Sequence, residues 1–306
     1  GIAAGMSAAA KLRRTDRGAE IVVYEKSPHI SFGACGLPYY VGGNFDNIDR
    51  MLVRTPEKVR ETGIDVKVEH EVLSLDVKNK TIKVKDLQSG EIFSDKYDKL
   101  MIATGAATII PPIENIETAY TLRSVEDGEK LKEKIQDESI KKVAVIGAGF
   151  IGLEVADVAK ELGKEVCVFN MGSRILEKVL DEEVTEILEE NLRAHGVELY
   201  FNTIVKSLET SPNKIKLITD TDEVEVDLVV LAAGVRPNTS FLKDTGIEML
   251  PNGAIVIDDE GKTSIQDIYA AGDCATVYHL VKEKQVYIPL ATNANKLGRI
   301  VGSNLG

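Results

Sequence analysis

Val143-Ala144-Val145-Ile146-Gly147-Ala148-Gly149-Phe150-Ile151-Gly152 is the most informative stretch of this chain. It joins a hydrophobic, strand-like run to a complete G-x-G-x-x-G pattern. Residues 153–162 then have a helical pattern, and residues 166–169 have the pattern of a second strand. This order is typical of a βαβ unit that binds a dinucleotide, because the glycines allow a pyrophosphate to approach the backbone at the N-terminus of the helix.

The second strand of this unit ends at Asn170. A carboxylate at this position favours NADH, because it accepts a hydrogen bond from the ribose 2′-hydroxyl and repels a 2′-phosphate. Asn170 can bond the hydroxyl but carries no charge, so the pattern leaves NADH and NADPH open. Arg174 is either a cation that attracts the phosphate of NADPH or an ordinary solvated loop arginine.

A second, less complete pattern opens the chain. Gly1-Ile2-Ala3-Ala4-Gly5 runs into an Ala-rich segment, and a later strand-like run ends at Glu25, twenty residues beyond Gly5. An acidic residue at that distance bonds an adenosine ribose in dinucleotide sites. No hydrophobic strand precedes Gly1, so we infer that the first strand is missing here. Taken alone, the same residues are equally compatible with an Ala-rich surface helix.

The remaining elements follow from local patterns. Residues 66–68, 72–77, 81–85 and 91–97 alternate and predict a small antiparallel meander. A short helix is expected at 55–62, with Pro56 in its first turn, and an amphipathic helix at 181–195. The stretch 100–106 is expected to be a buried strand that runs into a glycine turn, and 268–273 a strand that runs to a glycine and an acid. Residues 228–231 are expected to be a strand that ends at a similar turn. Two nucleotide-binding units imply two dinucleotides, and a flavin with a nicotinamide is the economical pair, since hydride can pass between them.

Composition excludes several classes of partner. The chain has 306 residues with 37 basic and 49 acidic side chains, a net charge of -12. We therefore expect no nucleic acid and no membrane partner. The three cysteines are widely spaced, which favours a reducing compartment over a disulfide scaffold, and we expect a cytoplasmic protein.

One cysteine stands where a loop is expected to become a helix, in Ser31-Phe32-Gly33-Ala34-Cys35-Gly36-Leu37-Pro38. Such a position favours the thiolate. No second cysteine stands five residues away, which excludes an internal redox disulfide on one helical face. Cys35 is either a buried, inert residue or the redox centre. The two nucleotide units favour the second interpretation, because they would deliver electrons to it.

Together these motifs resemble the pyridine nucleotide-disulfide oxidoreductase family over essentially the whole chain. The resemblance rests on Glu25, Ser31-Phe32-x-x-Cys35, Ala103-Thr104-Gly105, the glycine motif with Glu154, and Tyr269-x-x-Gly272-Asp273. The single cysteine is similar to that of the branch with coenzyme A-disulfide reductases and NADH oxidases. The resemblance implies an α/β fold with two nested Rossmann-like FAD/NAD(P)-binding domains, parallel sheets and small antiparallel meanders.

The implied activity is an FAD-dependent NAD(P)H oxidoreductase that reduces coenzyme A (CoA) disulfide, or a CoA persulfide, through Cys35. One alternative is an NADH oxidase or peroxidase that uses a Cys35 sulfenic acid; Ala3 stands where those enzymes carry a histidine, which weighs against it. A second alternative is a flavoprotein reductase of a small electron-transfer protein, with Cys35 inert.

The resemblance also implies three sets of binding residues and no metal. FAD would contact Gly1, Gly5, Glu25, Lys26, Val72, Ala103, Thr104, Gly105, Arg123, Gly272, Asp273 and Ala291. NAD(P) would contact Gly147, Gly149, Phe150, Ile151, Gly152, Glu154, Asn170 and Gly234. CoA would contact Ser7, Lys11, Arg14, Ser31, Ala34 and Asn295, although by composition Lys11 and Arg14 are equally an ordinary solvated basic face.

The expected domains are a discontinuous FAD-binding domain at 1–112 and 242–306, and an NAD(P)-binding domain at 113–241. Members of the family carry a further C-terminal interface domain, which we expect to be absent from this chain. A homodimer formed through that domain is the implied assembly.

Overall fold

The computed structural model describes residues 1–212 and 214–306. The chain forms two compact units, and each is made of separate pieces of sequence. The first unit contains residues 1–32, 52–107 and 236–306, and the second contains residues 33–51 and 108–235. Parallel sheets and small antiparallel sheets occur in the chain, so the predicted α/β class is confirmed. Residues 33–51, which carry Cys35, lie in the second unit although the sequence suggested a continuous first segment at 1–112.

The second unit is built on a parallel sheet in the order β10-β9-β8-β14. Its strands are β8 (Lys142–Ile146), β9 (Glu165–Phe169), β10 (Val197–Tyr200) and β14 (Leu228–Leu231). All four residues of β14 and the last four of β8 and β9 are buried, which is the pattern of a parallel sheet covered on both faces.

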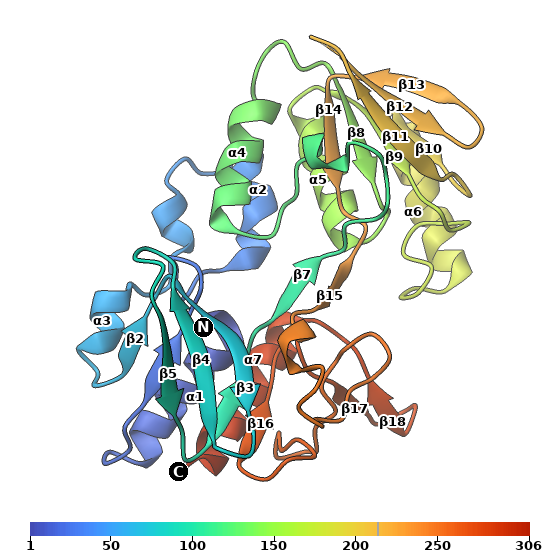
Figure 1. The fold of residues 1–306 in the computed structure, drawn as a ribbon. Helices are drawn as coiled ribbons and strands as arrows, with labels where there is room; N and C mark the ends of the chain where they lie inside the picture. Colours follow the sequence, from blue (N-terminus) through green and yellow to red (C-terminus); the bar gives the residue numbers. More distant parts are fainter. Residues whose placement is uncertain (213) are drawn as a thin grey trace. The chain divides into compact units, whose positions relative to one another are not determined.

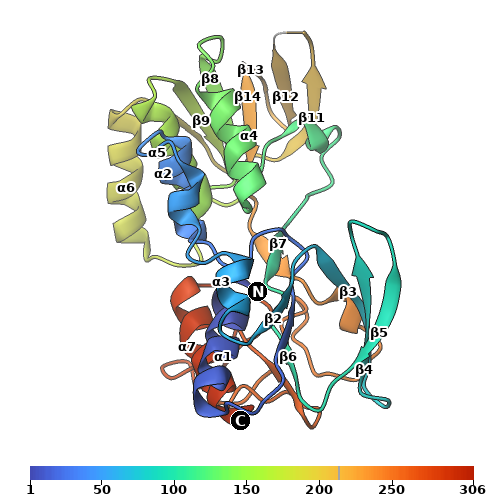
Figure 2. The ribbon, with the colours of Figure 1, turned by 90° about the vertical axis from the view of Figure 1, so that its left-hand side faces the viewer.

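Two kinds of structure cover this sheet. Helices α5 (Phe150–Glu161) and α6 (Glu182–Ala194) lie on one side (Figure 2). On the other side lies an antiparallel sheet of β11 (Val205–Thr210), β12 (Ile215–Thr219) and β13 (Glu223–Val226). Leu208 and Leu217 of that sheet share a core with Ala144 and Phe169.

The remaining pieces of the second unit are short helices. They are η1 (Ala34–Gly36), α2 (Leu37–Val41), η2 (Ile48–Met51), η3 (Ile116–Thr118) and α4 (Val125–Ile135). Ser124 and Asp127 form a capping box at the start of α4, which explains where that helix begins. The chain crosses between units within β7 (Ala106–Thr108) and β15 (Val235–Pro237).

The first unit is layered around the parallel pair β6 (Leu100–Ile102) and β16 (Ile268–Ala270) (Figure 1). Ile268 and Ala270 face the antiparallel meander of β3 (His70–Asp76), β4 (Thr81–Asp86) and β5 (Ile92–Lys96). Tyr269 faces the opposite way, toward α1 (Ile2–Thr15) and α7 (Ala291–Asn304). This alternation follows from the two-residue period of a strand.

The meander is shorter than the sequence suggested. Strand β2 (Asp65–Lys67) does not join it but pairs in parallel with β1 (Val22–Tyr24). Glu69 adopts a left-handed backbone (φ 56°) and ends β2 before β3 begins. Val66 is consequently buried with Met6 beside α1.

Other predicted elements are present, with one difference. Helix α3 (Pro56–Arg60) begins after Thr55, whose side chain accepts from the Lys58 N–H. Short elements η4 (Ser240–Leu242), β17 (Val277–His279) and β18 (Lys284–Val286) complete the first unit. The predicted helix at 181–195 is α6, but its apolar residues Ile187 and Leu188 are exposed.

Over the described ranges, no helix has the length and apolar character needed to span a bilayer.

Candidate functional site

The turn between β8 and α5 is shaped for close approach of a ligand backbone. Gly147 has a φ of 111°, and a side chain there would collide with the backbone of Ala232. A side chain at Gly152 would collide with the Gly147 carbonyl, whereas Gly149 faces open space. Helix α5 has no side-chain cap and no acidic residue in its first turn, so its N–H groups suit a pyrophosphate. Phe150 and Ile151 stand in that first turn.

Asn170 connects this glycine turn to the loop that follows β9. Its Oδ1 accepts from the Ala148 N–H at 3.4 Å, and its Nδ2 donates to the Arg174 carbonyl at 3.1 Å. The Arg174 guanidinium donates to the carbonyls of Leu180 (2.8 Å) and Glu177 (3.2 Å) and to the Thr185 hydroxyl. Arg174 therefore holds the loop together and is not simply a solvated side chain. Its positive charge remains, so attraction of the 2′-phosphate of NADPH stays a prediction.

Two further residues predicted to contact NAD(P) lie near the same sheet. Desolvation raises the pKa of the Glu154 carboxyl above its usual range, although its side chain remains partly open to solvent. Gly234 follows β14 with a φ of 101°, a conformation that favours glycine. The Gly234 carbonyl accepts from the Ile109 N–H at 2.9 Å.

In the first unit, the start of α1 meets the end of β1. The Glu25 carboxylate accepts from the Ser27 N–H at 2.9 Å, and its other oxygen lies 3.1 Å from the Gly1 amino group. Gly5 lies close to Ala103, so the glycine turn and the 103–105 segment are neighbours.

The second group of predicted FAD residues lies where α1 and α7 meet. Gly272 (φ 85°) is packed so closely that a side chain would stand 2.9 Å from the Ala4 Cβ. Asp273 follows it, and α7 begins at Ala291 with neither a side-chain cap nor an acidic first turn. The Thr104 hydroxyl donates to the Asn238 carbonyl at 2.8 Å, and Gly105 has a φ of 67°.

Three predicted FAD residues lie away from this arrangement or make other contacts. Lys26 pairs with Glu71 at 3.8 Å, and Val72 lies in β3, where the register shifts. Arg123 lies in the second unit, and its N–H donates to Asp127 at 2.9 Å.

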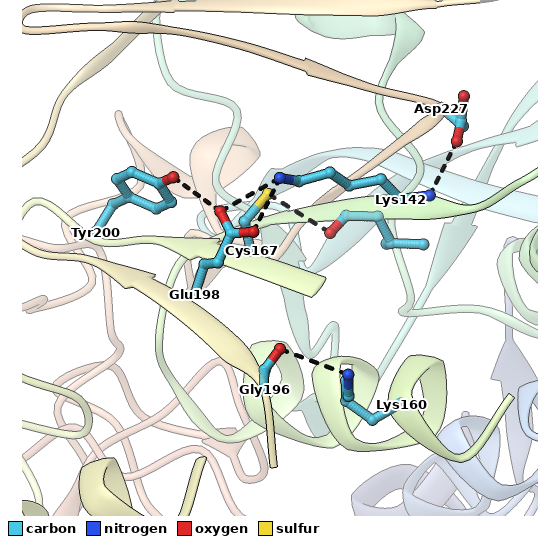
Figure 3. Close-up of polar contacts among 8 residues, drawn as sticks. Lys142, Lys160, Cys167, Gly196, Glu198, Tyr200 and Asp227 are labelled. Atoms are coloured by element: carbon cyan, nitrogen blue, oxygen red, sulfur yellow. Dashed lines mark hydrogen bonds and ion pairs between the residues drawn. The ribbon is translucent and has the colours of Figure 1, made fainter. Parts of the chain in front are cut away.

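The three cysteines have different environments. Cys35 is exposed on η1, immediately before α2. Cys167 is buried in β9 beneath a polar group in which Lys142 Nζ and Tyr200 both bond Glu198 (Figure 3). Burial raises the pKa of the Cys167 thiol to about 12 and also raises that of the buried Cys274. Of the three cysteines, only Cys35 is exposed.

The Cys35 segment is anchored to α4, which sequence reasoning missed. Lys132 donates to the Phe45 carbonyl at 3.1 Å, and its Nζ lies 4.2 Å from the centre of the Tyr40 ring. Gly128 allows close packing, because a Cβ there would stand 2.7 Å from Leu37. A glycine inside a helix is unfavourable and often marks a packing contact, so Gly128 was the available signal.

The predicted CoA residues are only partly brought together. Ser7 on α1 donates to Asn295 on α7 at 2.9 Å, and Lys11 and Arg14 lie on the same helix as Ser7. Ser31 belongs to the first unit and Ala34 to the second.

Among the described residues, no group of His, Cys, Asp and Glu is arranged to hold a metal ion.

Comparison with known proteins identifies the family. The family model for the pyridine nucleotide-disulphide oxidoreductases matches residues 1–298. The chain belongs to this family. The resemblance predicted from the sequence is thereby confirmed.

Relatives of this pyridine nucleotide-disulphide oxidoreductase include NADH oxidases and CoA-dependent sulfur reductases. An NADH oxidase of Enterococcus faecalis is 40% identical over 306 residues, which are 99% of this chain and 68% of that protein. A CoA polysulfide/persulfide reductase of Pyrococcus horikoshii is 34% identical and covers 100% of this chain and 68% of its own length. A solved water-forming NADH oxidase of Lactobacillus brevis, bound to NADH, superposes with a TM-score of 0.96 at 35% identity over 99% of this chain and 67% of that one.

The chain thus spans about two thirds of the length of these relatives. It is an oxidoreductase of the group that contains the NADH oxidases and the CoA-dependent sulfur reductases. Membership of the family implies FAD and NAD(P)H as its cofactors, as the sequence predicted.

Proposed function

We propose that this oxidoreductase uses NAD(P)H and FAD to reduce a CoA disulfide, or a CoA persulfide, with Cys35 as its reacting thiol. The observation that carries the proposal is the exposure of Cys35, in contrast to the burial of Cys167 and Cys274. A bulky disulfide can reach an exposed sulfur without any opening of the fold. Bound FAD would supply two electrons, taken from NAD(P)H, to the reaction at Cys35.

The local structure holds the sulfur in place while leaving it accessible. The Gly33 N–H donates to the Met51 carbonyl, and the Gly36 N–H donates to the Gly33 carbonyl, both at 2.9 Å. Leu37 and Val41 of α2 are buried. The cysteine therefore stands at the exposed end of an anchored helix, which reduces the conformational entropy lost when a substrate binds.

The proposed chemistry is thiol–disulfide exchange. The Cys35 thiolate attacks one sulfur of CoA disulfide, a new S–S bond forms to Cys35, and the other CoA leaves as a thiolate and takes a proton. Two electrons and a proton then release the second CoA and restore the Cys35 thiolate. The balance is NAD(P)H, one proton and one CoA disulfide giving NAD(P)⁺ and two CoA thiols.

Binding of CoA is assigned to the predicted residues. Lys11 and Arg14 are three residues apart on α1 and would attract its phosphates, while the bonded pair Ser7 and Asn295 offers neutral polar contacts. Gly147, Gly149 and Gly152 are assigned to NAD(P), and the residues around Gly1, Glu25 and Gly272 to FAD.

A second candidate is an NADH oxidase, which the Enterococcus and Lactobacillus relatives favour. In this case a first NADH would supply the two electrons that, with two protons, convert oxygen to hydrogen peroxide. The Cys35 thiolate attacks one peroxide oxygen, the O–O bond breaks, and Cys35 becomes a sulfenic acid while the other oxygen leaves as hydroxide and takes up a proton to form water. A second NADH supplies the two electrons that, with a proton, reduce the sulfenic acid back to the thiolate and release a second water.

The two candidate functions differ in their electron acceptor, and both assign the reaction to Cys35, so the tests are the choice of acceptor and a substitution of Cys35. We predict that Cys35→Ser keeps its flavin but loses CoA-disulfide reduction by at least about a hundredfold, since no thiolate remains to attack. The measurement is anaerobic NAD(P)H consumption together with released CoA thiol, with Cys167→Ala as a control that removes a buried thiol. Wild-type activity with oxygen alone would favour the oxidase. Undiminished reduction of CoA disulfide by Cys35→Ser would contradict both roles of the cysteine.

A further inference from the structure

The helical segment that carries Cys35 exposes one further side chain. Of the described residues 34–41, only Cys35 and Tyr39 are exposed. The side chain of Tyr39 is 55% exposed, whereas Leu37 and Val41 of the same helix are buried. Within the part of the chain that the structure describes, the Tyr39 hydroxyl forms no hydrogen bond. An aromatic ring without a partner thus stands on the helix of the proposed reacting thiol.

Tyr39 and Cys35 share one face of that helix. The two residues are four apart, and η1 runs directly into α2, with the Leu37 N–H donating to the Ala34 carbonyl. Gly36 and Leu37 both have right-handed helical backbone angles. Residues four apart on a helix have Cβ atoms about 5–6 Å from each other, and helical side chains lean toward the helix N-terminus. This geometry directs the Tyr39 ring toward the end of the helix that carries Cys35.

The neighbouring tyrosine packs into the unit instead. Tyr40 is 8% exposed, and its ring contacts Phe45 and Lys132, whose Nζ lies 4.2 Å from the ring centre. The backbone of Tyr39 is held as well, because its carbonyl accepts from the Asn44 N–H at 3.0 Å. The exposed ring therefore stands on an anchored backbone, so that its contact with a ligand costs little ordering of the chain.

A substrate that places a sulfur at Cys35 also brings the atoms next to that sulfur close to the Tyr39 ring. In CoA disulfide and in a CoA persulfide, the sulfur is followed by two methylene groups and a flat amide. Such an arm can cover an aromatic face, and covering part of one ring is enough for about a tenfold gain in affinity. A peroxide has no arm and gains nothing from this contact.

We propose that Tyr39 is a specificity-determining residue whose ring packs against the arm next to the substrate sulfur and selects thiols of the pantetheine type. This inference rests on the proposed function, because it takes Cys35 as the attacking thiol. It adds a contact at the reacting end of the substrate, whereas Lys11 and Arg14 are assigned to the phosphates at its other end.

The test compares three disulfides as substrates of the flavin-loaded enzyme, without oxygen and at saturating NAD(P)H. Bis(2-hydroxyethyl) disulfide has the methylene groups but no amide, pantetheine disulfide has the whole arm but no nucleotide, and CoA disulfide has both. We expect Tyr39→Ala to lower kcat/KM about tenfold for pantetheine disulfide and for CoA disulfide, mainly through KM. With the hydroxyethyl disulfide the change should be less than about twofold. Tyr39→Phe, which keeps the ring, should stay within about twofold of wild type for all three.

Two controls separate this contact from a structural role. Tyr278→Ala on β17 removes a ring of nearly the same exposure, 54%, from the other unit and should leave all three values unchanged. The rate at which iodoacetamide alkylates Cys35 reports the thiol itself and should be equal in wild type and Tyr39→Ala. Bound flavin should be equal as well. A slower alkylation or a loss of flavin in Tyr39→Ala would contradict the inference, since Tyr39 would then support the thiol or the cofactor.

The remaining outcomes distinguish the inference from the proposed function. If wild type and Tyr39→Ala reduce pantetheine disulfide with equal kcat/KM, Tyr39 does not contact the arm, and the proposed function stands. The inference also fails if only CoA disulfide is affected, because the contact would then lie at the nucleotide end. If Tyr39→Phe loses as much as Tyr39→Ala, the ring is not the selecting group. If the wild-type enzyme reduces none of the three disulfides, the proposed function fails, and the inference fails with it.

Discussion

Asp227 joins the turn between β13 and β14 to the start of β8. Its buried carboxylate accepts from the Lys142 N–H at 2.9 Å (Figure 3). It also accepts from the Lys141 N–H at 2.8 Å, and its other oxygen lies 2.8 Å from Lys214 Nζ. Burial alone would raise the pKa of Asp227, but Lys214 and the two N–H groups outweigh it and hold that pKa below its usual range. The sequence gives no sign of this role, because Asp227 resembles an ordinary turn residue between two strands.

We predict that Asp227→Asn lowers the free energy of unfolding by about 2 kcal/mol at neutral pH, because it breaks a buried, charge-assisted network. The carboxyl of Asp227 has a lower pKa in the folded protein than in the unfolded chain, where it is about 3.9. Its contribution to stability is complete above about pH 3.9, and it is lost as the pH falls through the lower pKa of the folded state. The deficit of the variant should therefore shrink below about pH 4. Urea unfolding at several pH values measures this, with the exposed Glu225→Gln as control. If the difference in unfolding free energy between wild type and Asp227→Asn stayed constant down to the lowest pH measured, the charge of Asp227 would not be its cause.

At the scale of elements, α1 and α7 cross in the first unit with their backbones in close contact. A side chain on Gly298 would collide with the backbone of Ala4, and one on Gly302 with the backbone of Ala8. The two glycines are four residues apart, so they lie on one face of α7. They let the helix backbones approach each other directly beside Gly272 and the start of α7, where the predicted FAD residues gather.

We predict that Gly302→Ala destabilises the protein by about 2 kcal/mol, since overpacking costs more than the gain in helix propensity returns. Thermal unfolding of the flavin-loaded protein is the measurement. Ser303→Ala, on the exposed side of the same turn, should change stability by less than about 0.5 kcal/mol. If Gly302→Ala and Ser303→Ala were equally stable, α1 and α7 would be able to move apart with little loss of unfolding free energy.

The second informative contact between elements is that of α2 with α4. Lys132 has a side chain only 12% exposed, and it bonds Asp46 at 3.2 Å as well as the Phe45 carbonyl. These bonds fix the chain that leaves α2, and so indirectly the position of Cys35. Lys132 thus holds the Cys35 segment in place.

We predict that Lys132→Met speeds hydrogen exchange of the Gly42 and Asn44 amides, which close the end of α2, by about tenfold. Bound flavin should be unchanged. The exposed Lys130→Met on the same helix is the matched control. If Lys132→Met and Lys130→Met exchange alike, the anchor lies in the apolar contacts of Leu37 instead.

For the whole molecule, the sequence was a good guide wherever a pattern is local. The strand, glycine turn and helix at 143–161 were found because their residues are neighbours in the chain. The partner of β2 was not found, because it depends on the backbone conformation of Glu69. The attachment of the Cys35 segment to α4 joins Leu37 to Gly128, about ninety residues apart, and no short motif records such a contact.

The site was predictable to the same extent. Residue types and spacing predicted the glycine turns, Glu25 and Cys35 as site residues, since each belongs to a continuous motif. The pattern of α6 correctly predicted a helix, but Ile187 and Leu188 show that an apolar stripe does not by itself report burial.

The crossing of α1 and α7 also has a consequence for synthesis. About 290 residues separate the starts of the two helices. A ribosome that adds about 5–20 residues per second needs roughly 15–60 s to cover that distance. Throughout this interval the small-residue face of α1 has no partner, whereas every piece of the second unit has already been made by residue 235. All residues of the second unit, with its glycine turn and Cys35, are therefore made before α7 completes the first unit.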